Sequence, residues 1–472
     1  MERNGSTWEK IEMEQTINLH NADCWETLKT LPDGSVHTII TDPPYDIGFM
    51  GKDWDKNSLI TNVDFWKECL RVLKSGGYLL SFGHSRTSHR MASAIENAGF
   101  EIRDTIMWIY GSGFPKSHNV ALSIDKKAGA PNRGKAIPVA STNLPTGKYA
   151  DEKLTGNKVD DYEAKTEQAK DWDGWGTALK PAHEPIVMAR KPLEGTVADN
   201  VLKHEVGALN IDATRIGSEE IKINVLEQWS GFGEKEKPDY QTKSNTGRWA
   251  SNVMFGHAED CEQIGTKEDE FTGGKKGSGG FATGYQKGDD YDNKKVSVPV
   301  WKCADGCPVK ALDEQAPNKG NLFKKKRNKG TSGGSGDSWT NGGKAAGEDN
   351  GFYDAPSGAS KFFYCSKVGK KERNAGLDGK PETTTDDGRE KSIDNPFQRG
   401  QTLRKNNHPT VKPIAVMEWL IKLVSREGQT VLDPFMGSGT TGIAAKRLGR
   451  NFIGCEREKD FYEIASARIE HG

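Results

Sequence analysis

Residues 430–456 read TVLDPFMGSGTTGIAAKRLGRNFIGCE, and this stretch decides the fold class. The apolar run 430–432 predicts a short buried strand, the glycine-containing turn 433–441 follows it, and a helix is expected after the turn. A second apolar run at 451–455 predicts another strand, which ends at Glu456. A strand, a glycine turn, a helix and a second strand form one unit of a parallel α/β sheet.

The glycine turn and the acidic strand end predict a nucleoside site. Gly437 and Gly439 allow positive φ angles and a close approach of the backbone to a ligand. Glu456 follows about twenty residues on, where a carboxylate at a strand tip can bind both ribose hydroxyls. The turn lacks the G-x-G-x-x-G pattern and a lysine after its second glycine, so a nucleoside without a phosphate tail, such as S-adenosylmethionine, fits best. The alternative is a plain glycine turn.

The first 125 residues or so repeat the alternation of strands and helices. Strands are expected at 35–41, 78–82 and 100–110, with helices at 63–73 and 88–98. Gly76 and Gly77 are expected to end the first of these helices, and Gly99 the second. Near the C-terminus, an amphipathic helix is expected at 412–427 with Pro413 in its first turn, and a last helix follows Glu456. We therefore predict a mostly parallel sheet.

Composition excludes several classes of protein. The chain has 472 residues, with 66 lysines and arginines against 67 aspartates and glutamates, a net charge of −1. A histone-like polycation is excluded, but a local basic cleft is not. Seven cysteines, an odd number, favour a reducing, cytoplasmic setting over a disulfide scaffold. No apolar run approaches the ~18 residues of a membrane span, and the charged N-terminus does not resemble a secretory signal.

A second motif, Asp42-Pro43-Pro44-Tyr45, directly follows the strand expected at 35–41. Consecutive prolines fix the backbone and remove two N–H donors, which leaves a rigid loop with available carbonyl groups. Asp42 and the carbonyl of Pro43 can accept the two hydrogens of an exocyclic amine on a planar nucleobase, which makes the amine nitrogen nucleophilic. Tyr45 can stack on the ring of that base. The alternative is an ordinary turn with a cap.

Together, the two motifs resemble those of the amino-group DNA methyltransferases of N6-adenine and N4-cytosine type. The catalytic motif comes first and the glycine-rich motif last, as in the β-class of phage and prophage type. The segments 19–31, 49–55, 408–413 and 454–464 also resemble this family. The resemblance implies an α/β fold with a Rossmann-like S-adenosylmethionine-dependent methyltransferase sheet, circularly reordered, with a loop-rich insert.

The resemblance also implies the role of each site residue. The catalytic loop comprises Asp42, Pro43, Pro44 and Tyr45, and the cofactor-binding residues are Asp23, Thr410, Lys412, Asp433, Phe435, Gly437, Gly439 and Glu456. The implied mechanism flips the base out of double-stranded DNA, and its amine attacks the sulfonium methyl directly. The segment 177–186 recurs in phage-type members, but the chemistry of His183 and Glu184 assigns them no role.

The sequence motifs leave alternatives for the target base and for the partners of the protein. Asp as the first residue of the tetrapeptide favours N6 of adenine, with N4 of cytosine as the alternative. An RNA or protein amide methyltransferase is a further alternative, although an asparagine is typical at the first position there. A DNA-binding protein without activity is the last. The resemblance leaves open a homodimer and a cognate restriction nuclease.

The middle of the chain differs from both ends. Glycine-rich stretches at 271–290 and 329–360 predict long loops, so we divide the chain into a catalytic half (1–215), a target-recognition insert (216–360) and a cofactor-binding half (361–472). A basic run at 324–327 is a candidate for phosphate contacts, or else a solvated loop. That run consists of Lys324, Lys325, Lys326 and Arg327.

The insert also carries two pairs of possible metal ligands. His257 and Cys261 form an H-x3-C pair, and Cys303 and Cys307 form a C-x3-C pair. Four such ligands in two short pairs can hold one tetrahedral structural zinc ion, which would help an insert with a small core to fold. The alternative is that they are unlinked thiols in loops.

Overall fold

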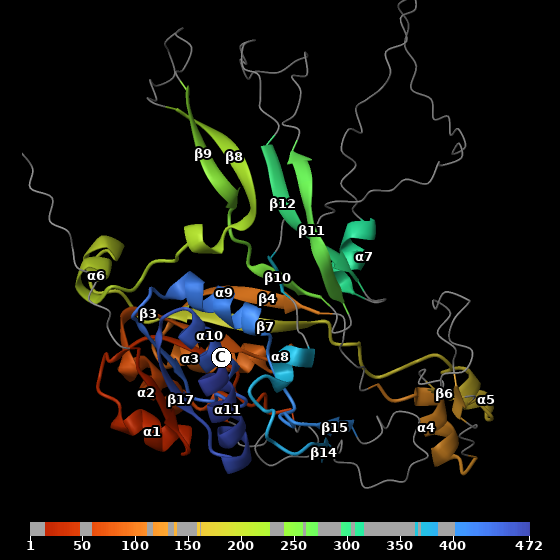
Figure 1. The fold of residues 1–472 in the computed structure, drawn as a ribbon. Coiled ribbons are helices and arrows are strands. Elements are labelled where there is room, and N and C mark those ends of the chain that lie inside the picture. The colour runs from red at the N-terminus through yellow and green to blue at the C-terminus, as the bar shows by residue number, and fades with distance from the viewer. Residues whose placement is uncertain are drawn as a thin grey trace, which may run out of the picture.

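A mixed nine-stranded sheet forms the centre of the molecule (Figure 1). The structure is a computed structural model, and it describes residues 15–47, 59–110, 117–130, 136–138, 158–160, 162–226, 240–257, 261–271, 294–303, 307–315, 364–366, 370–385 and 402–472. From edge to edge, the strands are β1 (Ile17–His20), β17 (Asn451–Cys455), β16 (Thr430–Asp433), β2 (Val36–Thr41), β3 (Leu73–Phe82), β7 (His183–Arg190), β4 (Glu101–Ile109), β10 (Val253–Gly256) and β13 (Tyr364–Ser366). Among these nine described strands, only β7 runs antiparallel to its neighbours, so the prediction of a mostly parallel α/β sheet is confirmed.

Helices cover both faces of this sheet. Consecutive strand residues point to opposite faces: Ile40 and Leu80 belong to one core cluster, and Ile39 and Leu79 belong to the other. The first cluster includes side chains of α9 (Ile414–Val424), α10 (Thr440–Arg447) and α11 (Lys459–His471). The second includes side chains of α1 (Cys24–Thr30), α2 (Val63–Val72) and α3 (Ser88–Asn97). Burial on both faces explains why the central strands are continuous apolar runs.

The two sequence motifs follow adjacent strands. β2 and β16 pair in parallel, with Val431 opposite Thr38 and Leu432 opposite Ile39. From this pair, the chain proceeds from β2 to β3 in one direction and from β16 to β17 in the other. The carboxyl ends of two such strands leave a crevice between them, which is where open α/β sheets bind ligands.

Two expected element boundaries were wrong. Gly76 and Gly77 do not end a helix but lie inside β3, which already begins at Leu73. Gly76 has a φ of 80°, and the register between β2 and β3 shifts across this part of the strand, as in a β-bulge. A side chain at Gly76 would collide with the Asn200 amide, at 2.2 Å.

The helix expected at 412–427 is shorter than predicted. It spans Ile414–Val424, with Pro413 as the N-cap residue instead of a member of the first turn. At its other end Ser425 adopts an extended conformation (φ −142°, ψ 153°), which stops the helix before Gly428. The late start of the helix matters for the site, because it leaves Lys412 on a non-helical segment.

The predicted insert contributes to the sheet itself. β10 lies within 216–360 and pairs in parallel with β4 and β13. Two antiparallel hairpins project from this side of the sheet, β8 (Ile216–Leu226) with β9 (Tyr240–Arg248) and β11 (Glu262–Phe271) with β12 (Lys294–Lys302) (Figure 1). The helix α7 (Pro308–Gln315) follows the second hairpin. The sequence predicted none of these strands, and the basic run 324–327 lies outside the described residues.

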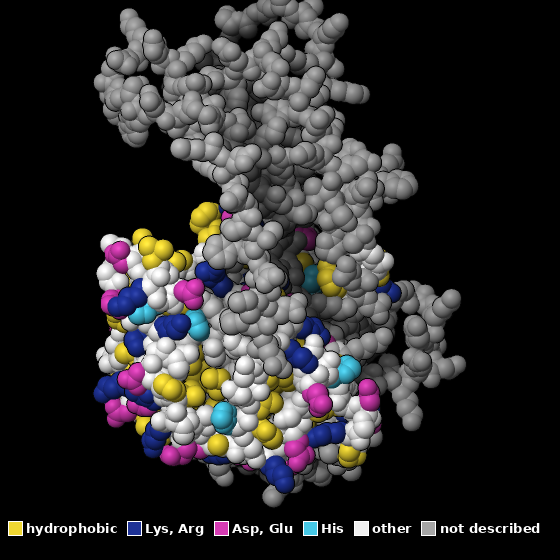
Figure 2. Space-filling model, turned by 60° about the vertical axis from the view of Figure 1, so that its left-hand side comes forward, with side chains coloured by type: hydrophobic (Ala, Val, Ile, Leu, Met, Phe, Trp, Pro, Cys, Tyr) yellow, Lys and Arg dark blue, Asp and Glu magenta, His cyan; other side chains and the backbone are white. Residues whose placement is uncertain are grey.

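The smaller elements lie in the connections. They are η3 (Leu59–Thr61), α4 (Val120–Lys127), β5 (Ala136–Pro138), β6 (Lys158–Asp160), α5 (Glu167–Lys170), α6 (Val197–His204), η4 (Asp212–Thr214), α8 (Lys370–Asn374), β14 (Thr383–Thr385) and β15 (Thr402–Arg404). Among the residues described, no helix has the length and apolar character to cross a bilayer. On the face shown in Figure 2, acidic and basic side chains are interspersed, in keeping with the net charge of −1.

Candidate active site

A cavity of about 1080 Å³ lies at the carboxyl ends of β2 and β16. Its wall contains the loop 42–45, the turn after β16 and the acidic end of β17. Ligand pockets in proteins commonly measure roughly 300–1,000 Å³, so this cavity has room for a nucleoside-sized molecule beside a second, planar group. Of the predicted catalytic and cofactor residues, all but Gly439 line it.

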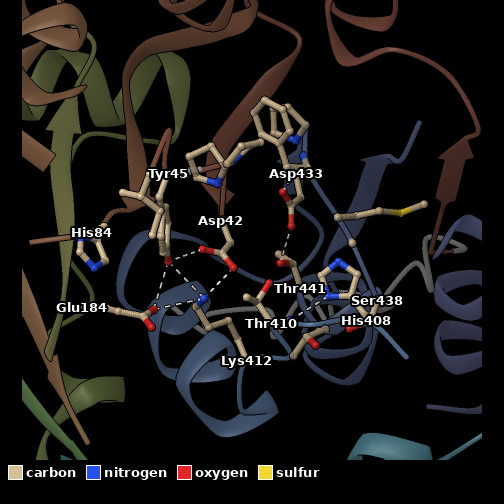
Figure 3. A pocket seen from close by; sticks show the side chains of 18 of the residues that line it. Asp42, Tyr45, His84, Glu184, His408, Thr410, Lys412, Asp433, Ser438 and Thr441 are labelled. Carbon is tan, nitrogen blue, oxygen red and sulfur yellow. Dashed lines mark hydrogen bonds and ion pairs between the residues drawn. The ribbon is translucent and has the colours of Figure 1, made fainter. Parts of the chain in front are cut away.

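Four polar side chains converge on one side of the cavity (Figure 3). The Lys412 ammonium lies 2.6 Å from Asp42 Oδ2 and 3.2 Å from Glu184 Oε2. The Tyr45 hydroxyl lies 2.6 Å from Asp42 Oδ1 and 3.1 Å from Glu184 Oε2. The two carboxylates and one ammonium are all more than four-fifths buried, so their charges interact strongly.

The electrostatics of this cluster fix two protonation states. Burial alone lowers the pKa of Lys412, but the neighbouring carboxylates of Asp42 and Glu184 outweigh it and raise that pKa. Lys412 therefore remains an ammonium. Burial, followed by the same two carboxylates, raises the pKa of Tyr45 well above its usual value, so its phenol remains neutral.

Three separate parts of the chain supply this cluster. Asp42 and Tyr45 follow β2, and Glu184 is the second residue of β7. Because β7 is antiparallel to β3, its first residues lie at the edge where β2 and β3 end. Lys412 enters from the segment before α9. The resemblance implied that Lys412 belongs with the cofactor, whereas the structure brings its ammonium against Asp42.

The buried side chain of Asp433 stabilises the glycine turn by hydrogen bonds. It is 2% exposed, and its carboxylate accepts hydrogen bonds from the hydroxyls of Thr41 (2.7 Å) and Thr441 (2.6 Å). The backbone N–H of Phe435 donates a third, at 3.0 Å. Burial nevertheless raises the pKa of Asp433 to about 6. Both carboxylate oxygens are thus occupied by the protein, and Asp433 joins β2 to the turn after β16.

The glycines are required by both conformation and space. Gly437 has a φ of 50°, and a Cβ atom there would lie 2.7 Å from His408 Nε2. Gly439 has a φ of 79° and is the N-cap residue of α10, where a Cβ would lie 3.0 Å from the backbone of Ala465. The sequence prediction of positive φ at these two positions is confirmed.

The remaining predicted cofactor residues lie around the turn. Burial raises the pKa of Glu456 to about 7, although the backbone N–H groups of Glu458 and Gly437 hydrogen-bond to its carboxylate. Asp23 caps α1 by accepting a hydrogen bond from the Trp25 N–H at 2.8 Å. Thr410 lines the cavity, and its N–H donates to His408 Nδ1 at 3.3 Å.

Several cavity residues were missed by the sequence analysis. Glu184 and His408 carry polar groups into the cavity, and His84 and Tyr110 also line it. Burial lowers the pKa of His408 to about 4, so the imidazole is neutral. The resemblance assigns no role to the segment 177–186, and within 408–413 it assigns only Thr410 and Lys412 to the cofactor. Their local patterns contain no signal of what they face, because that depends on strand order.

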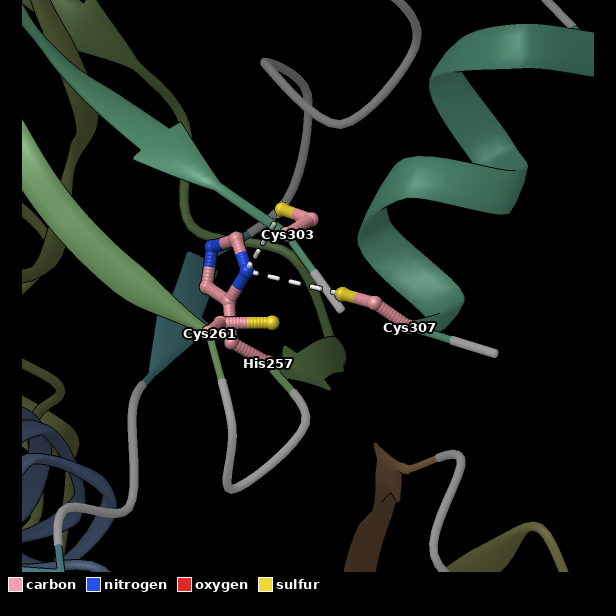
Figure 4. Close-up of side chains that lie close together, drawn as sticks. All are labelled: His257, Cys261, Cys303 and Cys307. Atoms are coloured by element: carbon pink, nitrogen blue, oxygen red, sulfur yellow. Dashed lines mark hydrogen bonds between the residues drawn. The ribbon is translucent and has the colours of Figure 1, made fainter. Parts of the chain in front are cut away.

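The four predicted metal ligands also come together, away from this cavity. His257, Cys261, Cys303 and Cys307 place their ligand atoms within 4.8 Å of one another (Figure 4).

The chain is similar to known DNA methylases. The model of the N6/N4 methylase family, described as DNA methylase, matches residues 36–467. Type II methyltransferase M2.DpnII of Streptococcus pneumoniae is 54% identical over 63 residues, which are 13% of this chain and 24% of that protein. Type II methyltransferase M2.LlaDCHI of Lactococcus lactis subsp. cremoris is 51% identical over 65 residues, 14% of this chain and 24% of that protein. The alignments thus span about a quarter of the length of these curated relatives.

Solved structures give more distant similarities. The M1.HpyAVI–SAM complex aligns with a TM-score of 0.34 and 15% identity, covering 96% of this chain and 99% of that one. The cytosine-N4-specific PvuII DNA methyltransferase aligns with a TM-score of 0.36 and 11% identity, covering 96% and 87%. The family match extends over nearly the whole chain and includes both motifs of the cavity. The chain therefore belongs to the N6/N4 DNA methylase family.

Proposed function

We propose that this protein transfers a methyl group from S-adenosylmethionine to the N6 amine of adenine in DNA. The observation that carries the proposal is that the loop 42–45 and the turn 433–439 line one cavity on adjacent parallel strands. One motif offers acceptors for an amine, and the other offers a nucleoside site. Their proximity allows a donor and an acceptor of the methyl group to meet.

The residues of the second motif fit S-adenosylmethionine. The backbone of Gly437 approaches the cavity without a side chain, and Glu456 presents a carboxylate at the end of β17, where ribose hydroxyls are bound in this class of sheet. When bound, S-adenosylmethionine supplies an electrophilic methyl group on a sulfonium. Phe435 and Asp23 extend the same wall.

Asp42 orients the target amine in this proposal. Each carboxylate oxygen can accept two hydrogen bonds, so Asp42 can receive the amine while it keeps its contacts to Lys412 and Tyr45. The amine nitrogen is acidified as it forms its new bond, and it then loses one proton. Tyr45 remains a neutral phenol and cannot take that proton. The proton therefore passes to Asp42, to Glu184 or to solvent.

Lys412 is a positioning residue in this scheme. Its ammonium lies between Asp42 and Glu184 and compensates part of their combined negative charge. Without it, two buried carboxylates that both contact the Tyr45 hydroxyl would repel each other. Lys412 thereby keeps Asp42 at the cavity wall.

The test is the identity of the product. The full chain is incubated with S-adenosylmethionine and unmethylated double-stranded DNA of diverse sequence, and the DNA is digested to nucleosides for mass spectrometry. We expect N6-methyldeoxyadenosine. N4-methyldeoxycytidine would keep the cavity and the chemistry but overturn the target base. If S-adenosylmethionine binds and neither product forms on DNA, while RNA becomes methylated, the DNA substrate is wrong.

A further inference from the structure

We infer that His257, Cys261, Cys303 and Cys307 bind one structural zinc ion, which attaches the β11–β12 hairpin and α7 to strand β10 of the main sheet. The sequence motif alone left zinc ligands and unlinked thiols as alternatives. The structure adds the convergence of four side chains from two separate segments. This inference does not depend on the proposed function.

The distances agree with tetrahedral coordination. His257 Nδ1 lies 3.5 Å from Cys303 Sγ and 3.6 Å from Cys307 Sγ. With Zn–S bonds of about 2.3 Å and Zn–N bonds of about 2.0 Å, tetrahedral angles place a bound nitrogen and sulfur roughly 3.5 Å apart. The side chains therefore need little movement to accept the ion, with His257 coordinating through Nδ1.

The chemistry of the four ligands favours zinc. Three thiolates and a neutral imidazole form a Cys3His set. Such ligands bind zinc in preference to calcium or magnesium, which take oxygen ligands. In the described chain, none of the three sulfurs is part of a disulfide. Cys307 directly precedes α7, and the N-terminus of a helix stabilises a thiolate.

The surroundings indicate a structural rather than a catalytic ion. Cys261 and Cys307 are each 1% exposed, and they belong to a small apolar cluster with Phe255 and Val309. The Trp301 ring stacks on the His257 ring, with centroids 4.4 Å apart. A buried site with four protein ligands has no open coordination position for substrate.

The position of the cluster explains what the ion would hold together. His257 follows β10, a strand of the main sheet, while Cys261 precedes β11 and Cys303 follows β12. β10 in turn pairs with β4, whose next residue, Tyr110, lines the cavity. One ion would thus join the hairpin, α7 and the sheet beside the candidate active site.

Metal content provides the first test. The full chain, purified without chelators from zinc-supplemented cells, is analysed by inductively coupled plasma mass spectrometry. We expect about one zinc ion per chain. Cys303→Ser and Cys307→Ser are each expected to lower that content at least about fivefold, while Cys69→Ala, a buried cysteine outside the cluster, leaves it unchanged. Less than about 0.2 zinc ions per wild-type chain would overturn the inference.

A spectroscopic test does not depend on how well the variants fold. The zinc ion of the wild-type protein is replaced by Co²⁺, and the absorption spectrum of the protein is recorded. We expect the charge-transfer and intense d–d bands of tetrahedral, thiolate-bound cobalt, which added zinc then abolishes. A spectrum of octahedral cobalt only, or a native disulfide between any two of the three cysteines in non-reducing peptide mapping, would overturn the inference.

Discussion

At the scale of the residue, Asp42 has the most direct chemical role in the proposed reaction. It contacts both the Lys412 ammonium and the Tyr45 hydroxyl, and it lines the cavity. An asparagine would keep the size of the side chain but lose the charge and one acceptor. Losing one preorganised polar contact to the reacting group commonly costs about 100-fold or more in kcat.

We therefore expect Asp42→Asn to lower kcat for DNA methylation at least about 100-fold with S-adenosylmethionine affinity nearly unchanged. Single-turnover methylation and calorimetric titration of the cofactor measure the two effects. Asp64→Asn, at a 72% exposed carboxylate on α2, is the matched control and keeps wild-type activity. Equal kcat in Asp42→Asn and wild type would refute the role of Asp42.

If Glu456 binds the ribose as we propose, cofactor binding depends on pH. Its pKa is raised to about 7, chiefly by burial, so the carboxylate becomes protonated as the pH falls through neutrality. A protonated carboxyl is a poorer acceptor for ribose hydroxyls. We expect the Kd for S-adenosylmethionine to rise as the pH is lowered from 8 to 6, and Glu456→Gln to raise the Kd about 10-fold or more at pH 8.

The glutamine variant should also remove most of that pH dependence. Calorimetric Kd values at several pH values test this, with Glu470→Gln at an exposed carboxylate on α11 as control. A raised carboxyl pKa also means that the folded protein binds the proton more tightly than the unfolded chain, so the stability that Glu456 contributes is present below about pH 4.5 and is lost as the pH rises to about 7. Cofactor affinity that is equal in wild type and Glu456→Gln would remove the ribose assignment.

At the scale of the element, the hydrogen bond from Thr41 to Asp433 joins the ends of β2 and β16. Thr41→Val would leave the buried Asp433 carboxylate with one donor fewer and raise its pKa further from about 6. The substitution lowers the free energy of unfolding only where the Asp433 carboxylate is ionised in the folded state. This loss of stability is therefore present above pH 6 and vanishes as the pH falls below 6. We expect a loss of about 1–3 kcal/mol in the free energy of unfolding at pH 8.

The same strand offers a control for this prediction. Thr38→Val removes a hydrogen bond to the carbonyl of Tyr78 at 2.9 Å, in which neither group is charged. Its effect on stability should be the same at pH 5 and pH 8. Urea unfolding of both variants at the two pH values makes the comparison, and a pH-independent loss in Thr41→Val would contradict the account of Asp433.

At the scale of the whole molecule, the sheet brings the two ends of the chain together. The loop at 42–45 and the turn at 433–439 are separated by almost the whole chain, yet they follow adjacent strands. Outward from β2, the sheet continues with β3, β7, β4, β10 and β13, and along the chain one hairpin precedes β10 and the other follows it. The region expected to contact DNA is thus attached, through β10, to the same sheet that holds the cavity.

The inferred zinc ion makes that attachment sensitive to chelators. Removing the ion would leave three thiols and an imidazole in an apolar cluster. We expect proteases then to cleave the β11–β12 hairpin and α7 at least about 10-fold faster. Limited proteolysis with mapping of the cut sites measures this. The helices α1, α2 and α3 on the sheet should stay protected, and added zinc should restore protection. Cleavage at equal rates with and without chelator would contradict this prediction.

Local sequence patterns determined the elements and the chemistry of the motifs. The apolar runs at 36–41, 430–433 and 451–455 form strands as expected, because a strand buried on both faces needs only consecutive apolar side chains. The positive φ angles at Gly437 and Gly439 follow from a turn that no other residue fits. The close grouping of His257 and the three cysteines was also anticipated by their spacing.

Only the tertiary structure decided which residues meet. Lys412 contacts Asp42, and Glu184 contacts Tyr45, because β7 runs antiparallel beside β3 and α9 begins two residues after Lys412. β10 joins the sheet between β4 and β13, and its short apolar run contains no indication of these partners. Hydrophobic period and turn residues act over a few positions along the chain, whereas strand order is set by packing between segments hundreds of residues apart. The sequence therefore determines the chemical groups of this site, and the fold determines their partners.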